Sequence, residues 1–284
     1  MNPALNPSFP LSALLVQLSD PHIREPGRLA YGRIDTAPFL AAAVASLGRL
    51  RQMPDAVVIT GDLTDFGRPE EYVHLARLLA PLAMPVYLMP GNHDDRQQLR
   101  SSFPQHSYLG TAGFVQYSVP VGGMQLIALD STQPGKSHGV LCQERLDWLE
   151  TELKKNQHKP VIVALHHPPF ATLIGHMDAI GLLEGSQALA ALLRRFTNIE
   201  RVISGHLHRA ISTRFGGTIA GTAPSTAHQI CLDLAADAAS AWTLEPPGYL
   251  LHALNAYGGL VTHQASTGIF AGPFPFHDAS GLID

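Results

Sequence analysis

The sequence predicts an α/β fold in which two sheets pack together and helices lie outside them. Three observations lead to this prediction. Short apolar runs alternate with longer segments whose apolar residues follow helical spacing. The apolar runs stop at polar clusters, so each fits a buried strand that leaves the core there. The chain has 284 residues, 45% hydrophobic and 15% charged, which suffices for a sizeable core and is atypical of disordered proteins.

The first half of the chain is predicted to form a β-α-β-α-β unit. Buried strands are expected at residues 14–18 (LLVQL), 56–60 (AVVIT) and 86–89 (VYLM). Helices are expected at residues 35–51 and 69–82, and Pro69 suits the first position of a helix because that position needs no N–H donor. The crossover connections of such a unit are expected to be right-handed.

The second half is predicted to contain a second set of strands with two helices. Strands are expected at residues 113–120, 124–130, 161–165 and 201–204, and helices at 143–155 and 186–196. Residues 209–263 suggest several short strands. The segment 268–277 is too rich in proline and aromatic residues for a regular element.

Composition excludes several classes of protein. A net charge of −4 provides no basic field for a nucleic-acid backbone, so long polynucleotides are poor candidate partners. The two cysteines, Cys142 and Cys231, form no C-x-x-C motif, which argues against a thiolate metal site and suits a reducing compartment. No apolar run approaches the ~20 residues that span a bilayer. The proline-broken first ten residues do not resemble a secretory signal, so we expect a cytoplasmic protein without membrane partners.

Potential metal ligands follow five of the predicted strands. The clusters are Asp20-Pro-His22, Gly61-Asp62-Leu-Thr-Asp65, Gly91-Asn-His-Asp94, His166-His167 and Gly205-His-Leu-His208. Each alone has a simpler interpretation as a turn, a cap or loop composition. Because ligands of open α/β sheets bind outside the carboxyl ends of the strands, five such clusters in this position indicate a functional site.

These five clusters resemble the sequence blocks of the calcineurin-like metallophosphoesterases, which read D-x-H, G-D-x-x-D, G-N-H-[DE], H-H and G-H-x-H. The similarity is greatest to the class III phosphodiesterases, which include bacterial cyclic-nucleotide phosphodiesterases and a related glycerophosphodiesterase. The segments 31–35 (YGRID), 67–72 (GRPEEY) and 94–95 (DD) resemble the glycerophosphodiesterase, and 223–230 (APSTAHQI) resembles both groups. The resemblance implies a four-layer α-β-β-α sandwich of two mixed sheets with a small C-terminal extension.

The resemblance also implies a pair of metal ions that share one carboxylate. It assigns the bridging role to Asp62, with Asp20, His22 and His208 around one ion and Asn92, His166 and His206 around the other. Oxygen and imidazole donors suit Fe, Mn, Co or Zn and leave the identity of the metal open. Two ions can clamp a phosphate and activate water at neutral pH, so a metal-bridging hydroxide would attack the phosphorus.

Three further residues are candidates for catalysis. His93 is expected to face the substrate, where its family counterpart contacts the phosphate or protonates the leaving oxygen, and Asp65 to orient His93 or to act as a simple cap. His228 matches a histidine beside the substrate phosphate. His167 is expected to pack near the metals without binding one, and Ser131 to contact such a residue or to cap a strand. Residues 170–185, with His176, suggest either a lid or a solvated loop.

We therefore expect a binuclear hydrolase of small phosphodiesters, either 3′,5′-cyclic nucleotides or glycerophosphodiesters. A phosphomonoesterase or pyrophosphatase with the same site is the alternative, since one fold hosts many functions. A metal-free scaffold would lack ligands, and none is missing. We divide the chain into an extension (1–12), a catalytic domain (13–241) and a C-terminal segment (242–284). The apolar tail of that segment suggests a subunit contact and a homo-oligomer.

Overall fold

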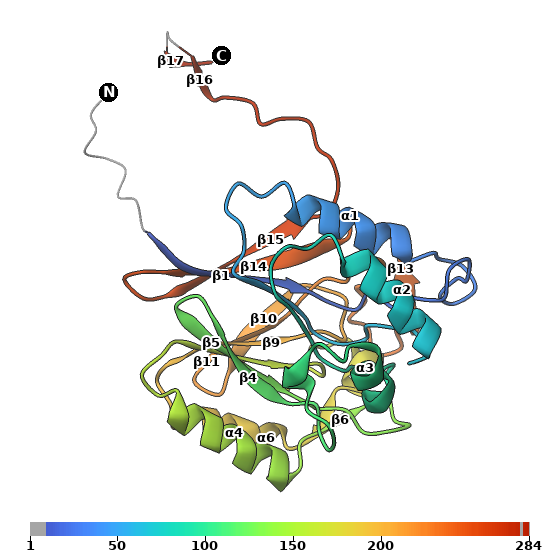
Figure 1. The fold of residues 1–284 in the computed structure, drawn as a ribbon, viewed down its shortest axis with the longest axis vertical. Coiled ribbons are helices and arrows are strands. Elements are labelled where there is room, and N and C mark those ends of the chain that lie inside the picture. Colours follow the sequence, from blue (N-terminus) through green and yellow to red (C-terminus); the bar gives the residue numbers. More distant parts are fainter. Residues whose placement is uncertain (1–9, 279–280, 284) are drawn as a thin grey trace.

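The chain, represented by a computed structural model, folds into two mixed sheets covered by helices on their outer faces (Figure 1). The structure describes residues 10–278 and 281–283. Residues 1–9 of the predicted N-terminal extension lie outside the described residues, whereas Leu11 and Ser12 already belong to the first strand.

The first sheet has the strand order β15-β14-β1-β2-β3. Its strands are β1 (Leu11–Leu18), β2 (Ala56–Ile59), β3 (Val86–Leu88), β14 (Gly248–Asn255) and β15 (Leu260–Ser266). β1, β2 and β3 are parallel, and the hairpin β14–β15 joins β1 in antiparallel pairing. The helices α1 (Ala37–Leu47) and α2 (Pro69–Leu79) connect the parallel strands, and Pro69 begins α2 as predicted.

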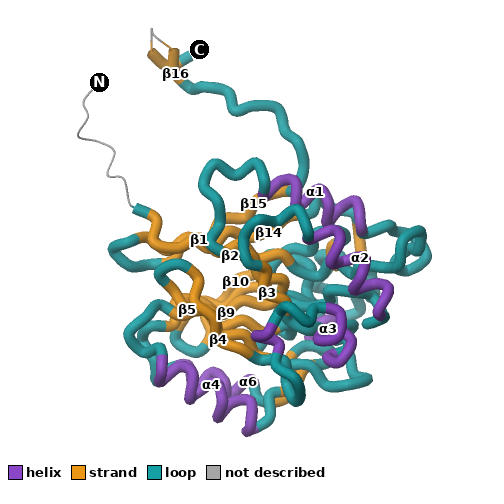
Figure 2. The backbone as a smooth tube through the Cα atoms, in the orientation of Figure 1, coloured by secondary structure: helices purple, strands orange, loops and turns teal. Residues whose placement is uncertain are grey.

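The second sheet has the order β10-β11-β9-β7-β5-β4. Its strands are β4 (Tyr117–Val121), β5 (Met124–Leu129), β7 (Val161–Leu165), β9 (Ile199–Ser204), β10 (Ile211–Phe215) and β11 (Thr218–Thr222). β5, β7, β9 and β11 are parallel. The helices α4 (Gln143–Lys155) and α6 (Ser186–Leu193) lie outside this sheet, and the tube in Figure 2 shows them on the side of the molecule away from α1 and α2.

Alternate residues of each strand produce the four layers. Val16 and Val57 pack under α1 and α2, whereas their neighbours Leu15 and Val58 face the other sheet. In the second sheet Ile127 faces α4 and α6, and Leu126 faces the first sheet. A strand with apolar residues on both faces is buried between two layers. The predicted α-β-β-α sandwich of two mixed sheets is therefore confirmed.

Short elements occupy the loops and the C-terminal end. They are α3 (Arg96–Ser102), the 3₁₀ turn Ser107–Leu109, β6 (Gly139–Val140), α5 (Gly175–Asp178), β8 (Leu182–Glu184), β12 (Gln229–Ile230), β13 (Trp242–Thr243), β16 (His277–Asp278) and β17 (Gly281–Leu282). Among the described residues, every helix is too short or too polar to cross a membrane.

The predicted boundary after residue 241 differs from the structure. β14 and β15 complete the first sheet, and β14 pairs with β1 along Leu11–Gln17, so residues 248–266 belong to the sandwich. Residues of β14 belong to the sheet because most of them are buried there and because β14 pairs with the edge of β1 that β2 does not occupy. After Gly268, whose carbonyl oxygen accepts a hydrogen bond from Arg49, the chain leaves the sandwich as an extended tail toward β16 and β17 (Figure 1).

Candidate metal centre

The five predicted clusters meet at one end of the sandwich, because each follows the carboxyl end of a parallel strand. Asp20 and His22 follow β1, Asp62 follows β2, and Asn92 follows β3. His166 follows β7, and His206 and His208 follow β9. The first sheet therefore contributes four of these side chains and the second sheet three.

One group of donor atoms surrounds the Nε2 atom of His22. This atom lies 3.2 Å from His208 Nε2 and 3.6 Å from Asp62 Oδ2. His208 Nε2 in turn lies 3.5 Å from Asp20 Oδ1. All four side chains are buried. Donor atoms at ~2.1 Å from one ion are separated by such distances, so this group can hold one metal ion.

A second group surrounds the Nε2 atom of His166. This atom lies 3.1 Å from Asn92 Oδ1 and 3.3 Å from Asp62 Oδ2. His206 Nε2 is buried and has no hydrogen-bond partner in the described part of the chain. Because a buried imidazole nitrogen without a partner is costly, His206 fits a metal ligand. The Asp62 Oδ2 atom faces both groups.

The remote nitrogens of the histidines are held by the protein. His166 Nδ1 lies 2.8 Å from the Thr60 carbonyl oxygen, and His208 Nδ1 lies 3.0 Å from that of His228. His22 Nδ1 lies 3.3 Å from Asp65 Oδ1. Such contacts fix the tautomer and leave Nε2 as the donor toward a metal. The residues present thus fit a pair of metal ions with nitrogen and oxygen donors.

The ligand loops have unusual backbone conformations. Asp20, His22, Asp62, His206 and His208 all have φ between 44° and 68°. Residues other than glycine seldom adopt the left-handed region, and such strain concentrates at functional sites. Gly91 is needed for a steric reason. A Cβ atom at this position would overlap the carboxylate and the backbone N–H of Asp62. Glycine therefore lets the β3 loop approach Asp62.

The charges of Asp62 and His166 depend on each other. Burial opposes ionisation of Asp62, but the neighbouring His166 holds the pKa of this carboxyl well below its usual range. Burial disfavours the charged form of His166 too, yet the Asp62 carboxylate raises its pKa to about 9. For His206, burial and the charge of His166 lower the pKa to about 3. Asp62 and His166 therefore favour their charged forms, whereas His206 favours the neutral imidazole.

His93 lies at the exposed side of the centre. Its ring packs edge-on against His22 at 4.7 Å, and its side chain is 33% exposed. The structure differs from the expected pairing with Asp65: His93 Nδ1 lies 2.8 Å from the Asp65 carbonyl oxygen and 3.9 Å from the carboxylate. The carboxylate instead contacts His22 and accepts a hydrogen bond from Arg24. A sequence motif cannot distinguish the two oxygen types of one residue.

His228 lies beside the first group of donors. Its ring is buried, 4.5 Å from His208, and neither ring nitrogen has a hydrogen-bond partner among the described residues. Two aromatic residues that the sequence analysis did not single out as site residues line this side. The Tyr31 ring lies 5.1 Å from His228 and the Trp242 ring 5.4 Å. Tyr31 is far from His228 and Trp242 in the sequence, so no local motif indicated that their rings lie together.

His167 is held on both sides of its ring. Nδ1 lies 2.8 Å from Ser131 Oγ, and Nε2 lies 3.1 Å from the Ser137 carbonyl oxygen. Both ring nitrogens thus have protein partners, which favours the expected role of His167 as a residue that packs near the metals without binding one. Ser131 contacts His167, which was one of the two roles expected for Ser131. The segment 170–185 is an ordered loop: Asp178 accepts hydrogen bonds from Thr172, and β8 pairs with β6. Ile174 and Met177 are buried whereas Leu173 is 68% exposed, so of the two expected forms the solvated loop holds only for part of the segment.

Asp94 and Arg24 support the metal centre through contacts with the segments that carry its residues. Asp94 accepts hydrogen bonds from the backbone N–H groups of Leu63, Thr64 and Gly91, and so ties the β2 and β3 loops together. Arg24 joins Asp65 at 3.1 Å to Glu71 at 3.1 Å. Asp94 ends a recognised motif, whereas Arg24 had no sequence signal beyond its position two residues after His22.

Comparison with known proteins gives consistent matches. The family described as calcineurin-like phosphoesterase matches residues 14–210. A probable glycerophosphodiester phosphodiesterase of Arcobacter nitrofigilis is 38% identical over 95% of this chain and 100% of its own. A probable cyclic nucleotide phosphodiesterase of Rhodopseudomonas palustris is 36% identical over 94% of this chain and 97% of its own. A dimetal phosphatase from Danio rerio has a similar fold, with a TM-score of 0.61 at 16% identity over 91% of this chain and 100% of that chain.

Proposed function

Since this chain belongs to the calcineurin-like phosphoesterase family, we propose that it is a metal-dependent phosphodiesterase that hydrolyses small phosphodiesters. The substrates we propose are glycerophosphodiesters and 3′,5′-cyclic nucleotides, after the names of the relatives that match almost the whole chain. The observation that carries the proposal is the donor set around Asp62, whose Oδ2 atom faces both His22 and His166.

We assign the ligands as the two donor groups indicate. Asp20, His22 and His208 would hold one ion, Asn92, His166 and His206 the other, and Asp62 both. When bound, two such ions supply Lewis-acid stabilisation of the phosphate charge and a nucleophilic water at neutral pH. Iron, manganese, cobalt and zinc all accept this set of nitrogen and oxygen donors.

His93 is proposed to hold the phosphate and to protonate the leaving alcohol. Its Nδ1 atom is engaged by the Asp65 carbonyl oxygen, so Nε2 is the atom available to substrate. A partly exposed imidazole beside a buried metal centre can reach a bound ester, and a positioned acid contributes typically 10²–10⁴-fold to such a step.

His228 is proposed to contact the substrate phosphate, as its unpaired ring nitrogens require a partner. The rings of Tyr31 and Trp242, 5.6 Å apart, continue this wall beyond His228. A flat apolar surface there suits the alcohol portion of the ester, whether a glycerol or a nucleoside.

We also propose that the protein forms a homo-oligomer and is located in the cytoplasm. Phe274 and Phe276 of the tail are 74% and 81% exposed, and exposed aromatic segments commonly mark interfaces. Cys142 and Cys231 are both free, as expected in a reducing compartment.

A substrate panel tests the proposed activity. The metal-free protein is loaded separately with Mn²⁺, Co²⁺, Zn²⁺ or Fe²⁺ and assayed with glycerophosphocholine, 3′,5′-cyclic AMP, bis-p-nitrophenyl phosphate and p-nitrophenyl phosphate. We expect kcat/KM to be highest for a diester with at least one metal. Higher kcat/KM for the monoester with every metal would establish a phosphomonoesterase instead.

A further inference from the structure

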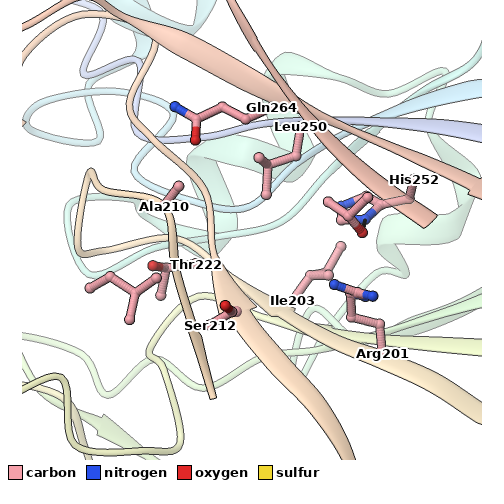
Figure 3. Close-up of a pocket in the computed structure, with 11 residues that line it drawn as sticks. Arg201, Ile203, Ala210, Ser212, Thr222, Leu250, His252 and Gln264 are labelled. Atoms are coloured by element: carbon pink, nitrogen blue, oxygen red, sulfur yellow. Dashed lines mark hydrogen bonds between the residues drawn. The ribbon is translucent and has the colours of Figure 1, made fainter. Parts of the chain in front are cut away.

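A cavity of about 290 Å³ lies between the edges of the two sheets. Strands β9, β10 and β11 of the second sheet form one side, and β14 and β15 of the first sheet form the other (Figure 3). No ligand candidate of the metal centre lines this cavity. Its volume is at the lower end of the range for small-molecule sites, so it suits a ligand of modest size.

One cation faces this cavity. Arg201, on β9, is the charged residue among the lining side chains. Its Nε atom is buried without a hydrogen-bond partner in the described part of the chain. Partial burial lowers the pKa of Arg201, whereas the neighbouring Glu200 carboxylate opposes this shift. A buried guanidinium donor that lacks an acceptor is costly and is normally satisfied by an anion.

The nearest imidazole cannot satisfy Arg201. His252 Nδ1 lies 2.9 Å from Thr262 Oγ1, and His252 Nε2 lies 3.1 Å from Gln17 Oε1. Both ring nitrogens are thus engaged. Burial, with the charge of Arg201 close by, lowers the pKa of His252 to about 3, so the ring stays neutral and adds no second positive charge.

The remaining walls are partly apolar. Ile203 and Leu250 face each other across the cavity (Figure 3), and Ile211 also lines it. Ser212 and Gln264 add polar side chains to the lining. One cation whose buried Nε–H lacks an acceptor in the described part of the chain, beside apolar side chains, matches a ligand with a single negative charge and a short hydrocarbon body. A phosphate monoester dianion would require a second cation, which this cavity lacks.

We propose that this cavity is a second binding site, distinct from the metal centre, for a small organic monocarboxylate. The carboxylate accepts hydrogen bonds from the Arg201 guanidinium, and the hydrocarbon body lies against Ile203, Ile211 and Leu250. A guanidinium matches a carboxylate in geometry as well as in charge.

The test measures binding of hexanoate to the metal-loaded protein by isothermal titration calorimetry, with inorganic phosphate present to occupy the metal centre. Hexanamide, which has the same body without the charge, is the control ligand. We expect hexanoate to bind and hexanamide to bind at least tenfold more weakly. Arg201→Gln should weaken hexanoate binding at least tenfold, and Ser212→Leu, which fills the cavity, should weaken it as well.

Arg214→Gln is the matched control, because Arg214 is exposed on neighbouring β10 and does not line this cavity. This variant should bind hexanoate as the wild type does. Circular dichroism melting of each variant establishes that it is folded. Equal affinity of wild type and folded Arg201→Gln, displacement of hexanoate by phosphate, or absence of binding at millimolar hexanoate would each overturn the proposal.

Discussion

The carboxylate of Asp62 and the imidazole of His166 form a buried ion pair across the two sheets, with Oδ2 3.3 Å from Nε2. Asp62 follows β2 of the first sheet and His166 follows β7 of the second. Each side chain favours the charged form of the other, although burial opposes both charges. Five predictions follow from this centre and from the rest of the fold.

Asp62→Ala removes the carboxylate that faces both donor groups. We expect kcat/KM for bis-p-nitrophenyl phosphate to fall roughly 10³-fold or more, about 4 kcal/mol of barrier, because neither ion would keep its shared ligand. Asp147→Ala, at an exposed position of α4, serves as the control and should retain activity. If kcat/KM of a folded Asp62→Ala protein falls by less than about tenfold, Asp62 is not the ligand shared by the two metal ions.

His93→Ala and His228→Ala separate proton donation from phosphate binding. If these histidines assist the leaving alcohol, the variants lose more kcat/KM on glycerophosphocholine than on bis-p-nitrophenyl phosphate, whose leaving group needs no proton. We expect the ratio of the two losses to be about tenfold or greater. Equal losses on both substrates would restrict the two histidines to positioning the phosphate.

Asp65→Asn tests whether this residue positions His22. The carboxylate contacts His22 Nδ1, so its neutral replacement should reduce metal affinity about 10–100-fold, while saturating metal restores most of kcat. Titration of activity with Mn²⁺ measures both quantities. The prediction is wrong if the metal titration curve is unchanged, or if kcat stays low at every metal concentration.

His252 should make stability depend on pH. The pKa of His252 is about 3 in the folded chain and ~6.5 when unfolded, so between these values the unfolded chain binds a proton that the folded chain does not. Stability should therefore decrease as the pH falls from about 6.5, by up to ~1.4 kcal/mol per pH unit. Urea unfolding at pH 6.5 and at pH 5.0 measures the free energy of unfolding at each pH. The decrease in this free energy between pH 6.5 and pH 5.0 should be smaller for His252→Gln than for wild type or for the exposed control His158→Gln.

The tail should contribute to assembly. Deletion of residues 268–284 removes Phe270, Phe274 and Phe276, which are largely exposed in the single chain. We expect size-exclusion chromatography with light scattering to give an oligomer for the full chain and a smaller species for the truncated one. A monomeric full chain would contradict this expectation.

The sequence predicted the sandwich and the ligand candidates because both depend on local signals. Buried strands such as Val161–Leu165 are continuous apolar runs, and the polar residue after each run marks its carboxyl end. The pairing of strands that are distant in the sequence could not be predicted in the same way. The partnership of β14 with β1 joins residues more than 230 positions apart, and no local pattern encodes it.

Contacts of individual atoms could not be predicted either. Asp65 offers a carboxylate to His22 and a carbonyl to His93, a distinction that depends on how the β2 loop turns. Likewise, Arg201 looks like an ordinary strand residue in the sequence. Its Nε atom is buried without a partner in the described part of the fold, where β9 and β14 line opposite sides of the cavity.

The division of the donors between the two sheets has a consequence for the order in which the protein assembles. Asp20, His22, Asp62 and Asn92 lie in the first third of the chain, whereas His166, His206 and His208 come after residue 160. Neither ion of the proposed pair has a complete donor set until the second sheet has docked on the first. If the proposed pair is bound in this way, we expect metal acquisition to follow the docking of the two sheets, and separation of the sheets to release the metal.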